Sequence, residues 1–154
     1  ELQNVNIELH IFGDGAEKSQ IEDLIRQNPQ KKIFFYGMLE RHILHEKLQF
    51  FDIAIVPLKT RIYGSVPSKI FEYGALGFPV LYFGGGEGET IVKENNLGWV
   101  ANVGDFESLN TMLIEISKTG KIEIQTMRKQ IFDYAENNFN LDFQIKNLIN
   151  KDVF

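Results

Sequence analysis

The sequence contains no cysteine, only four prolines and a single tryptophan among its 154 residues. The lack of cysteine excludes a disulfide framework and a thiolate metal site. It also fits a reducing compartment, so we expect a cytoplasmic protein. No apolar run approaches the roughly 18 residues of a membrane span, and no signal-peptide pattern opens the chain. We therefore expect no direct membrane span.

A surplus of basic residues is lacking as well. The chain has 16 Lys and Arg against 21 Asp and Glu, which gives a net charge of −5. Nucleic-acid and membrane-surface binders carry a basic footprint, so we expect no nucleic acid among the partners. One anionic ligand is still compatible with this balance, because it needs only a local group of cations such as Lys59, Arg61 and Lys69.

The sequence does contain enough apolar material for one full-sized core, since hydrophobic residues make up 44% of it. This length predicts a single domain over residues 1–154. The chain starts at Glu1 without Met and enters a strand-like run within a few residues. We therefore expect it to be a piece of a longer protein.

Apolar runs alternate with amphipathic stretches from end to end. Strands are predicted at 7–12, 32–36, 53–57, 79–83 and 99–101. Helices are predicted at 16–27, 40–50, from Pro67, at 89–95, from Asp105 or Ser108 to Ile116, and at 126–138, with a helical tail over 141–154. The first helix should carry Ile21, Leu24 and Ile25 on one stripe, and the second should direct Ile43, Leu44 and Leu48 inward. This alternation indicates βαβ crossovers and a mostly parallel sheet covered by helices on both faces.

Four loops follow predicted strands, at 13–15, 37–39, 58–66 and 84–88. Ligands of an open parallel sheet bind beyond the carboxyl ends of its strands. We therefore expect these four loops to converge at one edge of the sheet and to form a binding site there.

The segment from Lys59 to Pro79 is the most informative of the chain. Pro67 suits the first position of a helix, where its missing N–H would be unpaired in any case. Lys69 then lies in the first helical turn, where the helix dipole disfavours a cation. A lysine there makes sense beside an anion, because free N–H groups and a positive side chain, here with Ser68, form a phosphate site.

Glu72 lies one turn after Ser68 and Lys69, on the same side of the predicted helix. Two interpretations are open. The carboxylate forms a salt bridge with Lys69, worth a few tenths of a kcal/mol. Alternatively, as a group that only accepts hydrogen bonds, it receives two of them from a ribose diol.

The turn Gly13-Asp14-Gly15 follows the first predicted strand and resembles a phosphate-binding turn. It lacks the third glycine of a dinucleotide fingerprint, which argues against a nicotinamide cofactor. Both a plain tight turn and binding by the N–H groups of Gly13 and Gly15 remain open.

A second glycine-rich segment, Gly84 to Thr90, lacks the Gly-Lys-Ser/Thr ending of a P-loop. Glu87 and Glu89 would repel a bare phosphate, although acidic residues entering a helix also complement its dipole. Gly86 and Gly88 permit close approach of a ligand to the backbone. This loop is therefore a candidate for the border of the site.

The three histidines form no pattern typical of a metal site or a catalytic triad. His42 and His45 are three residues apart without a third ligand at suitable spacing, and His10 alternates with predicted buried neighbours. We identify no catalytic residue in this chain and expect neither a metal nor a cofactor. Any part in catalysis would consist of holding a leaving group.

Several segments together resemble a known family. They are Ile11 to Gly15, Phe35-Tyr36-Gly37, Phe51 to Pro57, Pro67-Ser68-Lys69-Ile70-Phe71-Glu72-Tyr73, Gly77-Phe78-Pro79-Val80, and Glu89 with Gly98. Over roughly residues 5 to 140 the chain resembles the C-terminal, donor-binding half of a GT-B-fold glycosyltransferase of family 4 (glycosyl transferases group 1). It is most similar to bacterial members that make capsule or O-antigen polysaccharide.

The resemblance implies a Rossmann-like, three-layer α/β/α domain and assigns roles to matching residues. Glu72 takes the place of the last Glu of a Glu-x7-Glu motif, which binds the donor's ribose. Ser68 and Lys69 lie by the diphosphate in such enzymes. The loop after the second strand contacts the base, which corresponds to Gly37, Met38 and Leu39 here.

The sequence departs from the family pattern at two places. The first Glu of the motif is replaced by Gly64, so its usual contact is missing or replaced. The Arg and Lys pair that normally neutralises the diphosphate lies upstream of the Gly13 turn in this family, and the chain begins too late to contain it. We expect the first strand and helix of a full donor domain to be absent as well.

The sequence therefore predicts a domain that binds a nucleoside-diphosphate sugar as substrate, for transfer by an intact enzyme in cell-surface polysaccharide synthesis. The partner would be an N-terminal acceptor domain of the same chain, and the full enzyme is compatible with a peripheral place at the inner membrane. The isolated piece is expected to be inactive. A sugar-nucleotide 2-epimerase and a non-catalytic nucleotide-sugar or partner-binding module are the alternatives.

Overall fold

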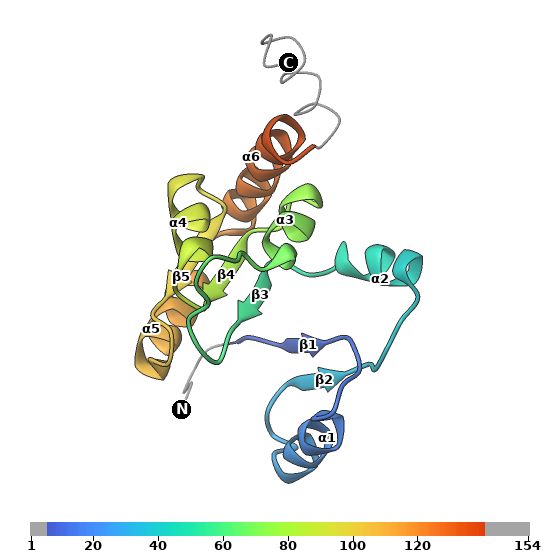
Figure 1. Ribbon diagram of the computed structural model, residues 1–154. Coiled ribbons are helices and arrows are strands. Elements are labelled where there is room, and N and C mark those ends of the chain that lie inside the picture. The colour runs from blue at the N-terminus through green and yellow to red at the C-terminus, as the bar shows by residue number, and fades with distance from the viewer. Residues whose placement is uncertain (1–5, 141–154) are drawn as a thin grey trace, which may run out of the picture. The chain divides into compact units, whose positions relative to one another are not determined.

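The structure, a computed structural model, describes residues 6–140, so the predicted tail at 141–154 lies outside the described residues. Figure 1 shows the order of its elements. The elements are β1 (Leu9–Ile11), α1 (Lys18–Gln27), β2 (Ile33–Phe35), α2 (Arg41–Leu48), β3 (Ala54–Pro57), α3 (Ser68–Ala75), β4 (Val80–Phe83), α4 (Glu87–Glu94), β5 (Gly98–Ala101), α5 (Phe106–Ile116) and α6 (Lys121–Asn138). They gather in two compact units, the first ending at Phe51 and the second beginning at Asp52.

The first unit is a two-stranded parallel sheet with two helices. Leu9 pairs with Ile33 and Ile11 with Phe35, and α1 contacts β2. No side chain within residues 6–51 is buried. The prediction that Ile43 points inward is wrong, since it is 36% exposed, and Leu24, on the predicted stripe of α1, is 55% exposed. Sequence periodicity places them on an apolar stripe, but so small a sheet cannot cover that stripe.

The second unit contains the core. Its three strands form a parallel sheet in the order β3-β4-β5, and its helices lie on both faces. Alternation along β4 sends Val80 and Tyr82 to one face, and Leu81 and Phe83 to the other. Successive side chains of a strand point to opposite faces, so an unbroken apolar run such as β4 suits a sheet that helices cover on both faces.

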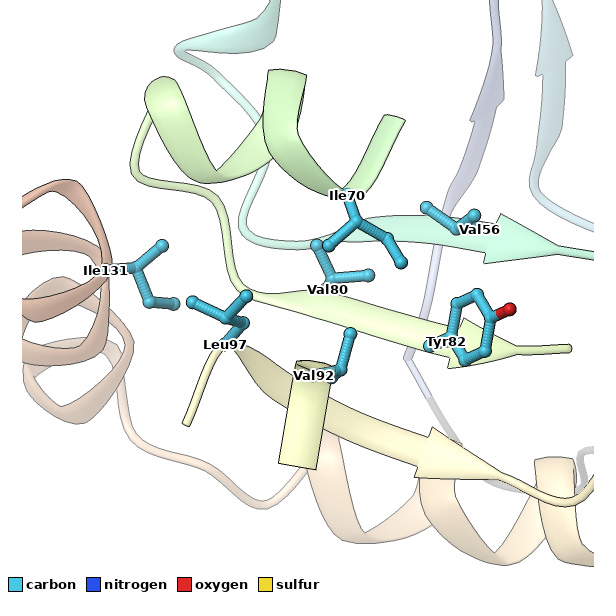
Figure 2. Packing of buried hydrophobic residues seen from close by; sticks show 7 residues of the cluster. All are labelled: Val56, Ile70, Val80, Tyr82, Val92, Leu97 and Ile131. Carbon is cyan, nitrogen blue, oxygen red and sulfur yellow. The ribbon is translucent and has the colours of Figure 1, made fainter. Parts of the chain in front are cut away.

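The larger cluster of buried side chains lies on the β4 face that α3, α4 and α6 cover. Figure 2 shows it, with Ile70 of α3 and Val92 of α4 directed at the sheet. Its buried members are Val56, Ile70, Val80, Tyr82, Val92, Leu97 and Ile131. The opposite face packs against α5 through Ile116. The starts of α3 and α4, which both follow strand ends, are thereby fixed to one rigid face.

Some helix boundaries differ from the predicted ones. Pro67 is the residue before α3 rather than its first residue, with an extended ψ of 124°. Helix α4 begins at Glu87 instead of residue 89, and α6 begins at Lys121 instead of residue 126. Of the two candidate starts for α5, Asp105 is the cap, because its carboxylate accepts the N–H groups of Glu107 and Ser108.

The predicted fold class is confirmed, a Rossmann-like α/β arrangement with parallel sheets. The strands nevertheless pair in two sheets of two and three strands rather than in one. The loops 13–15 and 37–39 follow strands of the first unit, and 58–66 and 84–88 follow strands of the second. Convergence of all four loops at one edge therefore stays a prediction.

Candidate functional site

The first turn of α3 brings together three predicted site residues of the second unit. The Ser68 hydroxyl donates to Oε1 of Glu72 at 3.0 Å, and Nζ of Lys69 lies 2.6 Å from Oε2 of the same carboxylate. All three side chains are exposed. The salt bridge between Lys69 and Glu72 thus exists, as one of the two interpretations predicted. Because exposed pairs are weak, a ligand can replace it at low cost.

The loop that precedes α3 rests on the start of α4. A Cβ on Gly86 would lie 2.5 Å from the carbonyl oxygen of Ile62, so the two backbones touch where only glycine fits. Gly86 also has a φ of 75°, which favours glycine. Next to it, the side chain of Arg61 would lie 3.5 Å from a Cβ on Gly85. Its guanidinium also lies 5.0 Å from the ring of Tyr63.

The glycine-rich segment is shaped by packing against Tyr82. A Cβ on Gly88 would lie 2.6 Å from the Tyr82 hydroxyl oxygen, and one on Gly84 2.8 Å from the same atom. The hydroxyl donates to the carbonyl of Gly85 at 2.9 Å. Burial raises the pKa of Tyr82, and the charges of Glu89 and Glu87 raise it further. The fold therefore requires at least Gly86 and Gly88, whether or not a ligand approaches them.

The two acidic residues of this segment have internal partners. Oε1 of Glu87 accepts the N–H of Gly64 at 3.1 Å, while Glu89 pairs with Lys93 one turn later at 2.6 Å. The Gly64 N–H, then the backbone N–H of Glu87 and the charge of Arg61 hold the pKa of the Glu87 carboxyl below its usual value. Sequence reasoning did not predict the contact of Glu87 with Gly64. Lys59, in the same loop, is exposed.

In the first unit, two N–H groups of the Gly13-Asp14-Gly15 turn are already engaged. Gly13 donates to the carbonyl of Gly37 at 2.8 Å, and Gly15 donates to the Asp14 carboxylate at 2.9 Å. Only the second bond lies within the turn, and neither bond decides between the two interpretations. The first bond ties this turn to the loop after β2.

The loop after β2 carries the residues predicted to contact the base. Gly37 has a φ of 69°, Met38 is 80% exposed and Leu39 is half-buried. Met38 is thus accessible to a ligand, while the backbone of Gly37 is fixed by the bond from Gly13.

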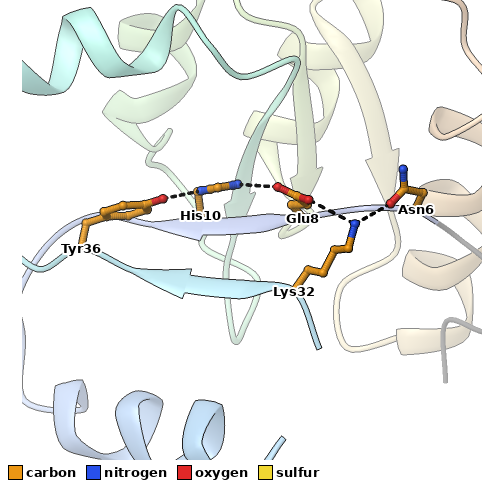
Figure 3. Close-up of polar contacts among 5 residues, drawn as sticks. All are labelled: Asn6, Glu8, His10, Lys32 and Tyr36. Carbon is orange, nitrogen blue, oxygen red and sulfur yellow. Dashed lines mark hydrogen bonds and ion pairs between the residues drawn. The ribbon is translucent and has the colours of Figure 1, made fainter. Parts of the chain in front are cut away.

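His10 is at the centre of a polar chain on one face of the first unit, which Figure 3 shows. Its Nδ1 lies 3.0 Å from the Tyr36 hydroxyl and its Nε2 lies 3.5 Å from the Glu8 carboxylate. The ring stacks with those of Phe34 and Tyr36. His10 is thus a residue of β1 whose two ring nitrogens both have a partner. The tyrosine that it contacts directly precedes the Gly37 loop.

Within the described part of the chain, no three His, Asp or Glu side chains gather in a way that would hold a metal ion. None of the helices over residues 6–140 has the length and apolar character needed to cross a membrane.

Comparison with solved structures places this fold among glycosyltransferases. A glycosyltransferase from Rickettsia africae matches 95% of this chain with a TM-score of 0.74 at 18% identity. WaaG, a glycosyltransferase involved in lipopolysaccharide biosynthesis, matches 97% of the chain with a TM-score of 0.69 at 17% identity. TarM matches 94% with a TM-score of 0.69 at 14% identity. At such identities the likeness shows the fold.

The chain corresponds to 39% of the length of the first two of these structures and to 28% of TarM. No sequence among the curated proteins matches it. A family profile does match, and it covers residues 1–119 under the description "Glycosyl transferases group 1". The chain therefore belongs to the glycosyl transferases group 1 family, with the fold of the C-terminal half of a GT-B enzyme.

Proposed function

We propose that this chain is the donor-binding part of a glycosyltransferase. It would bind a nucleoside-diphosphate sugar, whose sugar the intact enzyme passes to an acceptor during synthesis of a cell-surface polysaccharide. Membership of the family supports the transferase activity, and the described role of WaaG in lipopolysaccharide biosynthesis is compatible with this context. The acceptor would be held by an N-terminal domain of the same enzyme, in the cytoplasm.

The observation that carries the proposal is the group formed by Ser68, Lys69 and Glu72 at the start of α3. The Glu72 carboxylate already accepts one hydrogen bond from the Ser68 hydroxyl and one from the Lys69 ammonium group. A ribose diol offers two hydroxyl donors, so it can replace these two partners. The Lys69 ammonium group and the N–H groups of the helix start are then available to a diphosphate.

This arrangement assists the reaction through the leaving group. Negative charge develops on the nucleoside diphosphate as the bond to the sugar breaks, and fixed cations and N–H groups stabilise that charge. Lys69, Arg61 and Lys59 are the cations we assign to this role. Gly37, Met38 and Leu39 would contact the base. The backbone at Gly13, Gly15, Gly86 and Gly88, together with the backbone of Glu87 and Glu89, would border the ligand. No metal and no cofactor enters this proposal.

Calorimetry with uridine and guanosine diphosphate tests the site. The Glu72→Ala and Lys69→Ala variants should each bind about tenfold more weakly, the cost of losing a charged hydrogen bond. Lys118→Ala and Glu115→Ala remove exposed charges elsewhere and should leave affinity unchanged. Full affinity in both site variants would refute the assignment.

The reaction itself is tested in a protein that joins this chain to its acceptor domain, assayed against a panel of sugar nucleotides. We expect sugar transfer there, and binding without turnover for the 154-residue chain alone. An epimerised donor would favour a 2-epimerase instead. Absence of turnover with every donor would favour a non-catalytic binding module. The observation that supports this alternative is Gly64, which replaces the first glutamate of the motif.

A further inference from the structure

The loop between β3 and α3 is held by one side chain from another element. Glu87, in the first turn of α4, accepts the backbone N–H of Gly64 at 3.1 Å across 23 residues of sequence. One residue before Glu87, the missing side chain of Gly86 lets the carbonyl of Ile62 approach the start of α4. The loop over residues 61–64 thus packs closely against the start of α4 and is also joined to it by a charged hydrogen bond.

Neighbouring N–H groups and a nearby cation lower the pKa of the Glu87 carboxyl and so favour its ionised form. The Gly64 N–H is the first cause of its lowered pKa, followed by the N–H of Glu87 itself and the charge of Arg61. Glu89 on the same turn and Tyr82 beneath it are the other titratable groups nearby. An ionised acceptor makes a stronger hydrogen bond than a neutral one.

Gly64 is the position at which the family motif would supply a glutamate side chain. Here position 64 contributes only its backbone N–H to the bond with Glu87, and the carboxylate belongs to α4. Its Oε1 is directed at the loop, and a carboxylate repels a phosphate placed beside it. Glu87 is therefore suited to hold the loop rather than to contact the anion.

We infer that Glu87 is a positioning residue, which holds the 61–64 loop on the start of α4 and thereby places Arg61 for a diphosphate. The geometry that carries this inference is the Gly64 bond together with the packing of Arg61 against Gly85 beside it. The inference rests on the proposed function only in naming a diphosphate as the ligand of Arg61. The contact between the loop and α4 does not depend on the proposed function.

Nuclear magnetic resonance of the ¹⁵N-labelled chain tests the contact without any ligand. The Gly64 amide resonance should shift with pH, with a midpoint below that of an ordinary glutamate, because its acceptor titrates. The Glu87→Gln variant keeps an acceptor oxygen but should abolish the titration. The Glu87→Ala variant should also speed hydrogen exchange of the amide. Glu94→Gln, in the last turn of α4, is the matched control and should change nothing. A Gly64 amide that does not titrate in the unchanged chain would overturn the contact.

Calorimetry with uridine diphosphate, or guanosine diphosphate if that binds more tightly, tests the positioning role. We expect Glu87→Ala to weaken binding about tenfold and Glu87→Gln to weaken it less. Because Glu87 acts through Arg61, adding Glu87→Ala to Arg61→Ala should cause no further loss. An equal loss in both backgrounds would show direct contact with the ligand and overturn the inference. So would full affinity in Glu87→Ala.

The two failures are distinguishable. If the unchanged chain binds neither diphosphate, the proposed function fails, and with it the role of Arg61, while the Gly64 titration is still seen. If the diphosphate binds but the Gly64 amide does not titrate, the proposed function survives and the holding contact fails.

Discussion

The two units of this chain use their apolar side chains in different ways. From Asp52 on, side chains such as Ile70, Val80 and Leu97 are fully buried between a sheet and its helices. Before that point no described side chain is buried, and Phe34, Tyr36 and Leu24 are more than 40% exposed. The second unit thus has a core of its own, whereas local pairing and stacking organise the first.

This difference bears on the predicted site residues. Ser68 and Glu72 begin a helix that is anchored by Ile70, so their geometry is set by close packing. The turn at Gly13 and the loop at Gly37 are positioned by a few backbone hydrogen bonds. Sites built on rigid elements hold their geometry better than sites on loops. We therefore expect the second unit to be the better organised part in the absence of ligand.

A matched pair of leucines provides the largest test of this comparison. Leu97 is 0% exposed and Leu24 is 55% exposed. Leu97→Ala should lower the free energy of unfolding by about 2–5 kcal/mol, because it leaves a cavity in a packed core. Leu24→Ala should change it by no more than about 0.5 kcal/mol.

Urea unfolding measures both variants, followed by fluorescence and by circular dichroism. Trp99 is the only tryptophan and lies in β5, so fluorescence reports on the second unit, while circular dichroism reports on both. A loss above 1.5 kcal/mol for Leu24→Ala, three times the change expected of a surface site, would show that the first unit has a core after all.

A second test compares glycines. Gly88→Ala would place a methyl group 2.6 Å from the Tyr82 hydroxyl oxygen, and overpacking of this kind costs about 1–3 kcal/mol. Gly15 of the first unit has nothing within 4 Å of such a methyl group, so Gly15→Ala should leave stability nearly unchanged.

The same unfolding measurement decides this second test. The Tyr82→Leu background removes both the hydroxyl oxygen and the ring carbon Cζ, which would lie 2.6 and 2.7 Å from the methyl group, so Gly88→Ala should cost less there. An undiminished cost would mean that the tyrosine side chain is not what excludes the methyl group.

Much of this fold follows from local sequence signals. The order of strands and helices is the predicted one, and Asp105 caps α5 through the two N–H groups that a capping aspartate is expected to bind. The position of α3 follows from Pro67, which disfavours helix at the residue before it. These signals act within a few residues, so a single sequence contains them.

The features that were missed depend on contacts between distant residues. Helix α4 begins at Glu87 although Gly88 is a poor helix former, because Gly88 packs against Tyr82 of the preceding strand. The bond from Gly64 to Glu87 joins a loop to a helix 23 residues later, and no local sequence pattern links the two. The exposure of Leu24 depends on how large a sheet its helix meets. The ligand-binding roles of Ser68, Lys69 and Glu72 stay predictions, because they concern contacts with a molecule that is not part of the chain.

The smallest expected effect concerns the polar face of the first unit. Glu8 accepts a hydrogen bond from Lys32 at 3.2 Å. This bond, the charge of Lys32 and the contact with His10 hold the pKa of the Glu8 carboxyl below its usual value. A carboxyl with a lowered pKa in the folded state stabilises that state above the usual pKa, and the contribution is lost as the pH falls through the lowered value.

Lys32→Met should therefore return the Glu8 pKa most of the way to its usual value, as measured by magnetic resonance titration of its carboxyl carbon. Lys31→Met changes the net charge by the same amount one residue away and should leave that pKa in place. Equal shifts in both variants would mean that the general charge of the unit sets the pKa. A shift confined to Lys32→Met would show that the contact with Lys32 drawn in Figure 3 sets the Glu8 pKa, although no side chain described over residues 6–51 is buried.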